Sequence, residues 1–79
     1  MISGIREGAV IKRLPGEGNV TLSVSTTGGE GERWWFLNGE SLKGRNYNYS
    51  LKLYLPGNYQ LFVMDEAGQT ATVNFELGR

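Results

Sequence analysis

The chain has neither histidine nor cysteine among its 79 residues. The first absence removes the commonest general base near neutral pH and the commonest metal ligand. The second excludes thiol catalysis, zinc sites built on cysteine and any disulfide. The acidic residues do not alternate along the chain as the ligands of a calcium loop do. We therefore expect no bound metal ion and no cofactor.

Net charge and long apolar runs are missing as well. Eight basic and eight acidic side chains cancel to a formal net charge of zero, so no long-range field favours nucleic acid as a partner. No apolar run approaches the roughly 20 residues that cross a bilayer. The sequence thus predicts no nucleic-acid binding and no direct membrane insertion by this domain.

Catalytic motifs are absent or wrongly spaced. Serine transpeptidases need Ser-x-x-Lys, whereas Ser41–Lys43 and Ser50–Lys52 are each one residue too short. The glycine-rich segments 16–18 and 28–31 contain acidic residues and precede no expected helix, so they indicate turns rather than phosphate loops. A glycosidase pair would need acidic residues that fall in expected turns or at strand ends, namely Glu30, Glu32, Glu40, Asp65 and Glu66. We expect no catalytic residue and no enzymatic activity.

The sequence does contain strong period-two alternation. Its twelve glycines interrupt every stretch that could form a long helix, while apolar and polar residues alternate as in half-buried strands. The first strand, over residues 2–6 and 9–13, is expected to be an edge strand interrupted at Glu7–Gly8. The other expected strands cover residues 20–25, 33–37, 40–42, 50–55, 59–63 and 71–77. This spacing predicts an all-β fold, a small immunoglobulin-like antiparallel β-sandwich of about seven strands.

The connections between these strands have recognisable turn chemistry. Asn38–Gly39 is the strongest hairpin signal, because both residues tolerate positive φ. Pro56–Gly57 and Glu66–Gly68 predict two further turns, and Asp65 is expected to cap the second of them through its side chain. With no linker or repeat between the turns, we expect a single domain over residues 1–79.

Two positions sharpen the sandwich prediction. Trp35 shares a strand face with Leu37, so it is expected in the core, as the tryptophan of strand C is in immunoglobulin domains. Tyr59 has the spacing of a tyrosine corner, with Leu61 where an antibody domain carries its second cysteine. The Tyr59 hydroxyl is then expected to bond a backbone group a few residues upstream.

The same alternation sends the intervening apolar side chains outward. Strands 33–37 and 59–63 are expected to be neighbours, so these side chains would form one surface cluster of Trp34, Phe36, Phe62 and Met64. Such a cluster indicates a docking surface. Two alternatives are open: a one-residue register shift would exchange the two faces, or the side chains of Arg33 and Tyr54 would cover part of the cluster.

The order of these motifs resembles the C-terminal domain of bifunctional penicillin-binding proteins of the 1C type. The resemblance rests on Trp35–Gly39 and Leu55–Gln69, with Ile2–Ser3 and Glu7–Ala9 near the start and strand 71–77 at the end. It implies a non-catalytic accessory domain from the C-terminus of a larger protein, periplasmic and part of a membrane-anchored parent in the bacterial cell envelope. The parent's peptidoglycan glycosyltransferase and transpeptidase domains would precede it. The implied partner is that transpeptidase domain or another cell-envelope protein.

Two other functions are compatible with the sequence. The polar and aromatic stretch around Asn46–Tyr49 suggests a carbohydrate-binding module for peptidoglycan glycan strands, in which aromatic side chains stack on sugar rings. The candidates for stacking are Trp34, Tyr47, Tyr49 and Tyr54. A purely structural spacer is the third possibility, and it predicts that no aromatic cluster is exposed.

Overall fold

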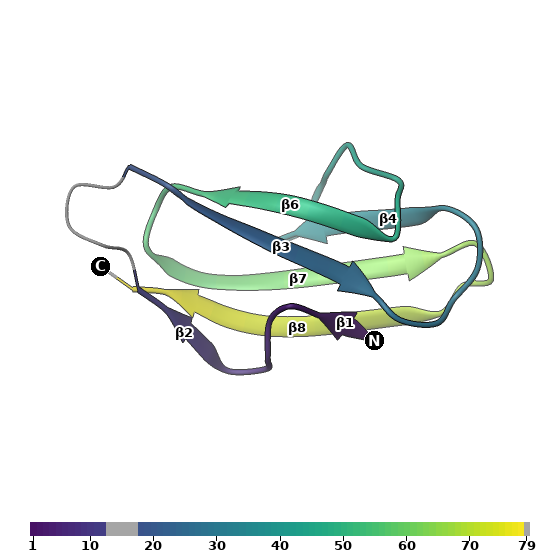
Figure 1. Cartoon of the computed structure of the whole chain (residues 1–79), viewed down its shortest axis with the longest axis horizontal. Coiled ribbons are helices and arrows are strands. Elements are labelled where there is room, and N and C mark those ends of the chain that lie inside the picture. Colours follow the sequence, from purple (N-terminus) through teal and green to yellow (C-terminus); the bar gives the residue numbers. More distant parts are fainter. Residues whose placement is uncertain (13–17, 79) are drawn as a thin grey trace.

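The computed structural model describes residues 1–12 and 18–78, and these residues form strands, turns and loops with no helix. Eight strands make two sheets that pack face to face (Figure 1). The small sheet has the order β1-β3-β6, with β1 at Ile2–Ser3, β3 at Val20–Thr26 and β6 at Asn48–Leu53. Both of its strand pairs are antiparallel.

The large sheet contains the other strands in the order β2-β8-β7-β4-β5. Its longest members are β7, Gly57–Asp65, and β8, Thr70–Leu77. The remaining strands are β2 at Ala9–Ile11, β4 at Arg33–Leu37 and β5 at Glu40–Ser41. Every pair in this sheet is antiparallel except β2 with β8, which is parallel.

The prediction of an immunoglobulin-like sandwich is confirmed. In that fold, strands A, B and E belong to one sheet, while G, F, C and C′ belong to the other. Here β1, β3 and β6 take the first set of places, and β8, β7, β4 and β5 take the second. The expected neighbours β4 and β7 pair from Arg33↔Asp65 to Leu37↔Leu61.

The prediction that residues 2–6 and 9–13 form one strand is wrong, although both halves lie at the edge of a sheet as expected. The two halves belong to different sheets, because β1 pairs with β3 whereas β2 pairs with β8. The chain changes sheets at Gly4, whose φ is +101°. A carboxylate oxygen of Glu7 then accepts a hydrogen bond from the backbone N–H of Asn74, 2.9 Å away, and this contact draws the chain onto the edge of β8. Because the expected first strand is divided into β1 and β2, the described residues form eight strands rather than about seven. The second half, β2, makes the parallel pair with β8. Arg13, the expected end of the strand, lies outside the described residues.

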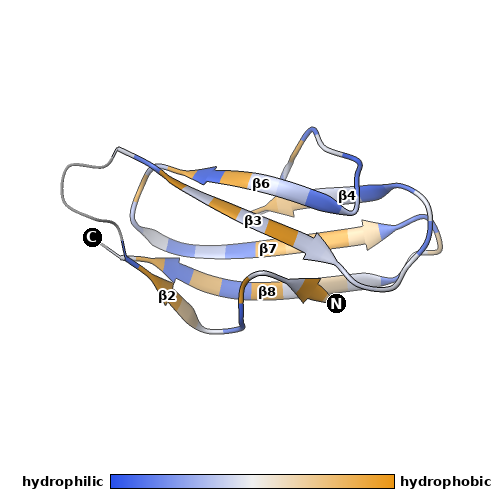
Figure 2. Ribbon diagram, viewed as in Figure 1, coloured by the Kyte–Doolittle hydropathy of each residue, from blue (hydrophilic) through white to orange (hydrophobic). Residues whose placement is uncertain are grey.

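The core lies between the sheets and follows the alternation of the strands. Figure 2 shows apolar and polar residues alternating along β3 and β8. Trp35 is fully buried, as predicted, and its indole N–H donates to the carbonyl oxygen of Asn46 at 2.9 Å. The other buried apolar side chains are Ile2, Val24, Leu51, Leu53, Leu61, Val63, Val73, Phe75 and Leu77.

Two predicted turns are present with the expected geometry. Asn38 and Gly39 have φ angles of 51° and 84° and join β4 to β5. The Tyr59 hydroxyl donates to the carbonyl oxygen of Leu55, four residues upstream, which completes a tyrosine corner. The Tyr59 ring also stacks on Phe75, with ring centroids 5.6 Å apart. This corner fixes the start of β7 and with it the register of the strand that carries half of the candidate site.

Candidate docking surface

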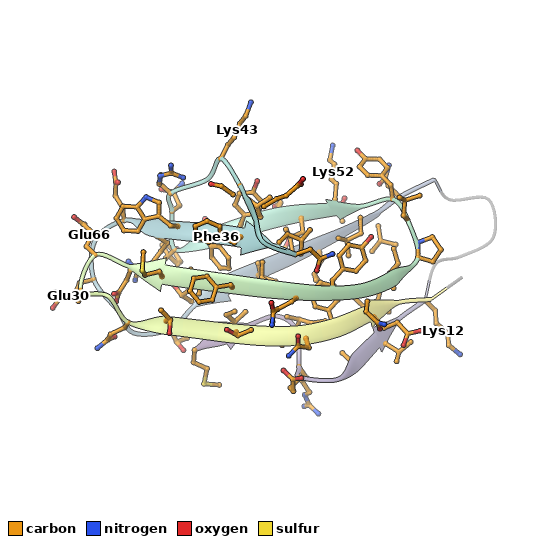
Figure 3. The ribbon with its side chains drawn as sticks, turned by 180° about the vertical axis from the view of Figure 1, so that it is seen from behind. Lys12, Glu30, Phe36, Lys43, Lys52 and Glu66 are labelled. Carbon is orange, nitrogen blue, oxygen red and sulfur yellow. The ribbon has the colours of Figure 1, made fainter. Side chains whose placement is uncertain are left out.

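The pairing of β4 with β7 places four apolar side chains together on the outer face of the large sheet. Trp34 lies opposite Met64, and Phe36 lies opposite Phe62. Cross-strand partners point to the same face of a sheet, and the buried Trp35 between them points to the other face. Figure 3 views the molecule from this side and shows Phe36 on the outer surface of β4. We call Trp34, Phe36, Phe62 and Met64 the aromatic patch.

The aromatic patch is a cluster separate from the core. Ten partly buried hydrophobic residues pack against the core, and none of the four patch residues is among them. The rings of Phe36 and Phe62 instead pack edge to face, with centroids 5.6 Å apart and planes at 61°. Each patch side chain is partly buried rather than open. The two phenylalanine rings thus shield each other, and each of the four side chains keeps part of its surface toward solvent.

Hydroxyl side chains border the patch on both sides. On β8, Thr70 lies opposite Met64 and Thr72 lies opposite Phe62. On β5, Ser41 lies opposite Phe36. All three bordering residues are exposed. An apolar centre with a polar rim is the usual anatomy of a protein interface.

Arg33 does not cover the patch, contrary to one of the sequence-based alternatives. Its side chain is buried, with 7% of its surface exposed. Its Nε donates to the hydroxyl oxygen of Thr26 at 3.1 Å, and its other nitrogens donate to the carbonyl oxygens of Gly28, at 3.0 Å, and Gly31. The guanidinium thereby holds the glycine-rich loop against the end of the sandwich, just beside the patch.

Asp65 is the buried counterpart of Arg33 on β7, with 5% of its surface exposed. Its carboxylate accepts hydrogen bonds from the backbone N–H groups of Gln69, at 2.8 Å, and Glu30, at 3.2 Å. The first of these confirms the predicted turn cap. Burial raises the pKa of Asp65, but hydrogen bonds from the backbone of Gln69, Glu30 and Ala67, and then the charge of Arg33, lower it below its ordinary value of 3.8.

Sequence reasoning missed the burial of Arg33 and Asp65, although the signal was present. Both residues stand at the inward positions of their strands, in step with Trp35 and Val63. Strict period-two alternation therefore predicted two inward charges. Inward charged residues need partners, and the glycine-rich loop supplies them together with Thr26 and Gln69.

The structure does not bring the four candidate sugar-stacking residues together. Trp34 lies on the outer face of the large sheet, whereas Tyr49 points inward and packs against Trp35 with ring centroids 6.0 Å apart. Tyr47 and Tyr54 are exposed, but they flank opposite ends of β6. No single sugar chain binding on one face would contact all four.

Comparison with known proteins identifies the family. Residues 1–75 match the Penicillin-Binding Protein C-terminus Family. The chain belongs to that family. Over 74 residues it is 57% identical to Penicillin-binding protein 1C of Escherichia coli (strain K12). That match covers 94% of this chain and 10% of the relative, so the chain spans about a tenth of the length of the curated relative. No solved structure matches the chain.

Three of the other candidate residues of this Penicillin-Binding Protein C-terminus Family member, Glu30, Glu32 and Glu66, lie together at one end of the sandwich, whereas Glu40 lies apart on β5. Glu30, Glu32, Glu40 and Glu66 are all exposed at strand ends and turns. Within residues 1–12 and 18–78, no three acidic side chains gather as metal ligands would, and no helix is long and apolar enough to cross a membrane. Part of the glycine-rich segment 16–18 lies outside the described residues. The aromatic patch is accordingly the feature on which a functional proposal rests.

Proposed function

We propose that this domain is the non-catalytic C-terminal accessory domain of a bifunctional penicillin-binding protein. The parent would be a membrane-anchored peptidoglycan glycosyltransferase and transpeptidase in cell-wall synthesis, with this domain in the periplasm. Membership of the family and the similarity to Penicillin-binding protein 1C support this assignment. The domain would work by docking its aromatic patch on the transpeptidase domain of the same chain.

The observation that carries the docking proposal is the separation of the patch from the core. In the described chain, the partly buried hydrophobic residues fall into those that pack against the core and the four that do not. The second group includes a tryptophan and two phenylalanines in register on adjacent strands. Folding alone does not require large apolar side chains on a solvent-facing sheet surface.

The path of the chain supports docking within one parent molecule. The start of the chain lies at the same end of the sandwich as Trp34 and Met64, because the carbonyl oxygen of Met1 accepts a hydrogen bond from Thr27 and Met1 lines a small hollow with Asp65. A preceding domain would therefore join the sandwich at the end that carries Trp34 and Met64. A short tether provides an effective concentration in the millimolar range, so even a weak apolar contact would be occupied.

The size of the patch fits such a tethered contact. Stable interfaces between separate proteins bury about 1,600 Å² in total, which is far more than four partly buried side chains expose. Apolar burial contributes roughly 25 cal/mol per Å². The patch would thus bind weakly between separate molecules and adequately within one chain.

A binding experiment tests the proposal. The double variant Trp34→Ser, Phe62→Ser should bind the separately produced transpeptidase domain of the parent at least about tenfold more weakly, which is about 1.4 kcal/mol. The matched control is Tyr47→Ser, Leu55→Ser, which removes two exposed apolar side chains outside the patch. Titration followed by amide chemical shifts measures both affinities, and the far-ultraviolet circular dichroism spectrum shows that each variant is folded.

Two outcomes would contradict docking through the patch. One is equal affinity of the patch variant and the wild-type chain. The other is binding of muropeptides or glycan strands at millimolar concentration, with shifts at Trp34 and Phe36 and no association with the transpeptidase domain. The second outcome would assign the patch to carbohydrate instead.

A further inference from the structure

One strand edge differs from the other three in length. The outer strands β1 and β5 have two residues each and β2 has three, whereas β6, at the edge of the small sheet, has six. Very short edge strands are a common protection against pairing with another chain. Among the edges that the described residues form, three have that protection, and the edge at β6 does not. Figure 1 shows β6 next to β3, with the loop that leads into it rising beside one half of the strand.

The pairing of β6 with β3 determines which of its backbone groups point outward. The N–H of Thr26 donates to the carbonyl oxygen of Tyr47 at 2.8 Å, and these residues continue the register Ser25↔Asn48. Hydrogen-bonded and non-hydrogen-bonded pairs alternate along an antiparallel ladder. Odd-numbered residues of β6 therefore bond to β3. The N–H and C=O groups that point away from the sheet belong to Asn48, Ser50 and Lys52.

The segment before β6 bonds to β4 rather than to the outward backbone groups of β6, although Gly44 lies against the Tyr49 ring. The backbone N–H of Leu42 donates to Trp35, and the carbonyl oxygen of Arg45 accepts from Arg33, both at 2.8 Å. The carbonyl oxygen of Asn46 accepts from the Trp35 indole. These bonds hold the segment against β4. Among the described residues no strand pairs with the outer edge of β6, and Asn48, Ser50 and Lys52 are all exposed.

We infer that this edge is a self-association site, at which β6 of a second copy of the chain adds as an antiparallel strand. The two-fold axis passes through Ser50, so that Ser50 pairs with Ser50 and Asn48 pairs with Lys52 of the second copy. In this register each outward N–H and C=O group meets a partner. The interface is isologous and closed, as in most homodimers, and the small sheets of the two copies become continuous.

The charges of the edge favour this register. Like charges directly opposite each other across a strand pair are destabilising. With the axis at Ser50, the positive Lys52 faces the neutral amide of Asn48. With the axis shifted to Lys52, the two lysines would face each other and fewer backbone groups would be paired. The register that pairs all three outward residues of each copy is thus also free of charge repulsion, and this self-complementarity is the reason for assigning a second copy as the occupant.

Amide hydrogen exchange of the isolated chain tests the inference directly. As the concentration rises between about 0.05 and about 2 mM, the range in which small interfaces associate, exchange should slow at Asn48, Ser50 and Lys52. The amides of Tyr49, Leu51 and Leu53 already bond to β3 and should change little. Sedimentation equilibrium over the same range should show a monomer and a dimer.

Paired variants test the register. Asn48→Lys places one lysine opposite Lys52 of the other copy at each end of the interface and should weaken the dimer, whereas Asn48→Glu places opposite charges there and should strengthen it by roughly threefold or more at low salt. Ser50→Pro removes the central N–H donor, which the fold itself does not use, and should abolish the dimer. Ser50→Ala is its matched control and should dimerise like the wild-type chain.

The results that would overturn the inference are specific. They are a monomer at about 2 mM, or a dimer with equal affinity in Asn48→Lys, Asn48→Glu and the wild-type chain. If Ser50→Pro fails to fold, the two Asn48 variants and the pattern of amide exchange still test whether β6 forms the dimer. A dimer that is abolished by Trp34→Ser would place self-association on the aromatic patch and would also contradict the β6 edge.

Discussion

At the scale of single residues, two adjacent tryptophans have opposite roles. Trp35 is fully buried and hydrogen-bonded to Asn46, while Trp34 belongs to the patch on the other face of β4. The sequence predicted this division, because strand alternation assigns neighbours to opposite faces and Leu37 placed Trp35 on the inward side. It did not predict that the patch residues would be partly buried, since that depends on how the rings of Phe36 and Phe62 pack.

Conservative substitution of each tryptophan should separate the two roles. Trp35→Phe leaves a cavity and removes the indole bond to Asn46, so the free energy of unfolding should fall by about 2–4 kcal/mol. Trp34→Phe should change it by less than about 1 kcal/mol. Urea unfolding followed by circular dichroism measures both values. A loss for Trp34→Phe equal to or larger than that for Trp35→Phe would reverse the assignment of faces.

At the scale of elements, local turn chemistry was predictable and the choice of sheet was not. The Asn38–Gly39 hairpin and the Tyr59 corner follow from short motifs that restrict the backbone. The two halves of the first strand carry the same alternation, and nothing local says which sheet each joins. That choice depends on contacts with distant residues, of Ile2 with the core and of Glu7 with Asn74.

Gly4 should be the residue that permits the change of sheet. A Cβ atom at Gly4 would lie within 3.0 Å of the carbonyl oxygen of Ser23 on β3, whereas a Cβ atom at Gly8 would have nothing within 4 Å. Both glycines have positive φ, which costs alanine about 1–2 kcal/mol. Gly4→Ala should therefore destabilise the fold by at least about 1 kcal/mol more than Gly8→Ala, as measured by urea unfolding. Equal losses would show that the close approach to β3 has no energetic importance.

At the scale of the whole molecule, one end of the sandwich is closed by a network around Asp65. The carboxylate joins the turn after β7 to the glycine-rich loop before β4 through Gln69 and Glu30. The backbone N–H of Glu32 adds a bond to the carboxylate of Glu66 at 2.7 Å. This end also carries the aromatic patch and the start of the chain. These bonds join the loop and the turn that flank the Trp34 and Met64 end of the patch.

The same network should make the stability of the whole domain sensitive to acid. Because the pKa of Asp65 is lower in the folded chain than its ordinary value of 3.8, the carboxylate stabilises the fold above that value and loses this contribution as pH falls through the folded pKa. Asp65→Asn should be less stable than the wild-type chain at pH 7. Its side-chain NH2 group would face a backbone N–H group, so two donors would meet where the carboxylate oxygen accepts a hydrogen bond. Protonation makes the wild-type side chain resemble the amide of Asp65→Asn. The difference in urea midpoint between the wild-type chain and this variant should therefore shrink between about pH 5 and about pH 2.

Carbon NMR of the Asp65 carboxyl group should show a titration midpoint below 3.8. A difference in midpoint that stays constant to the lowest pH would mean that Asp65 stabilises this end through shape alone.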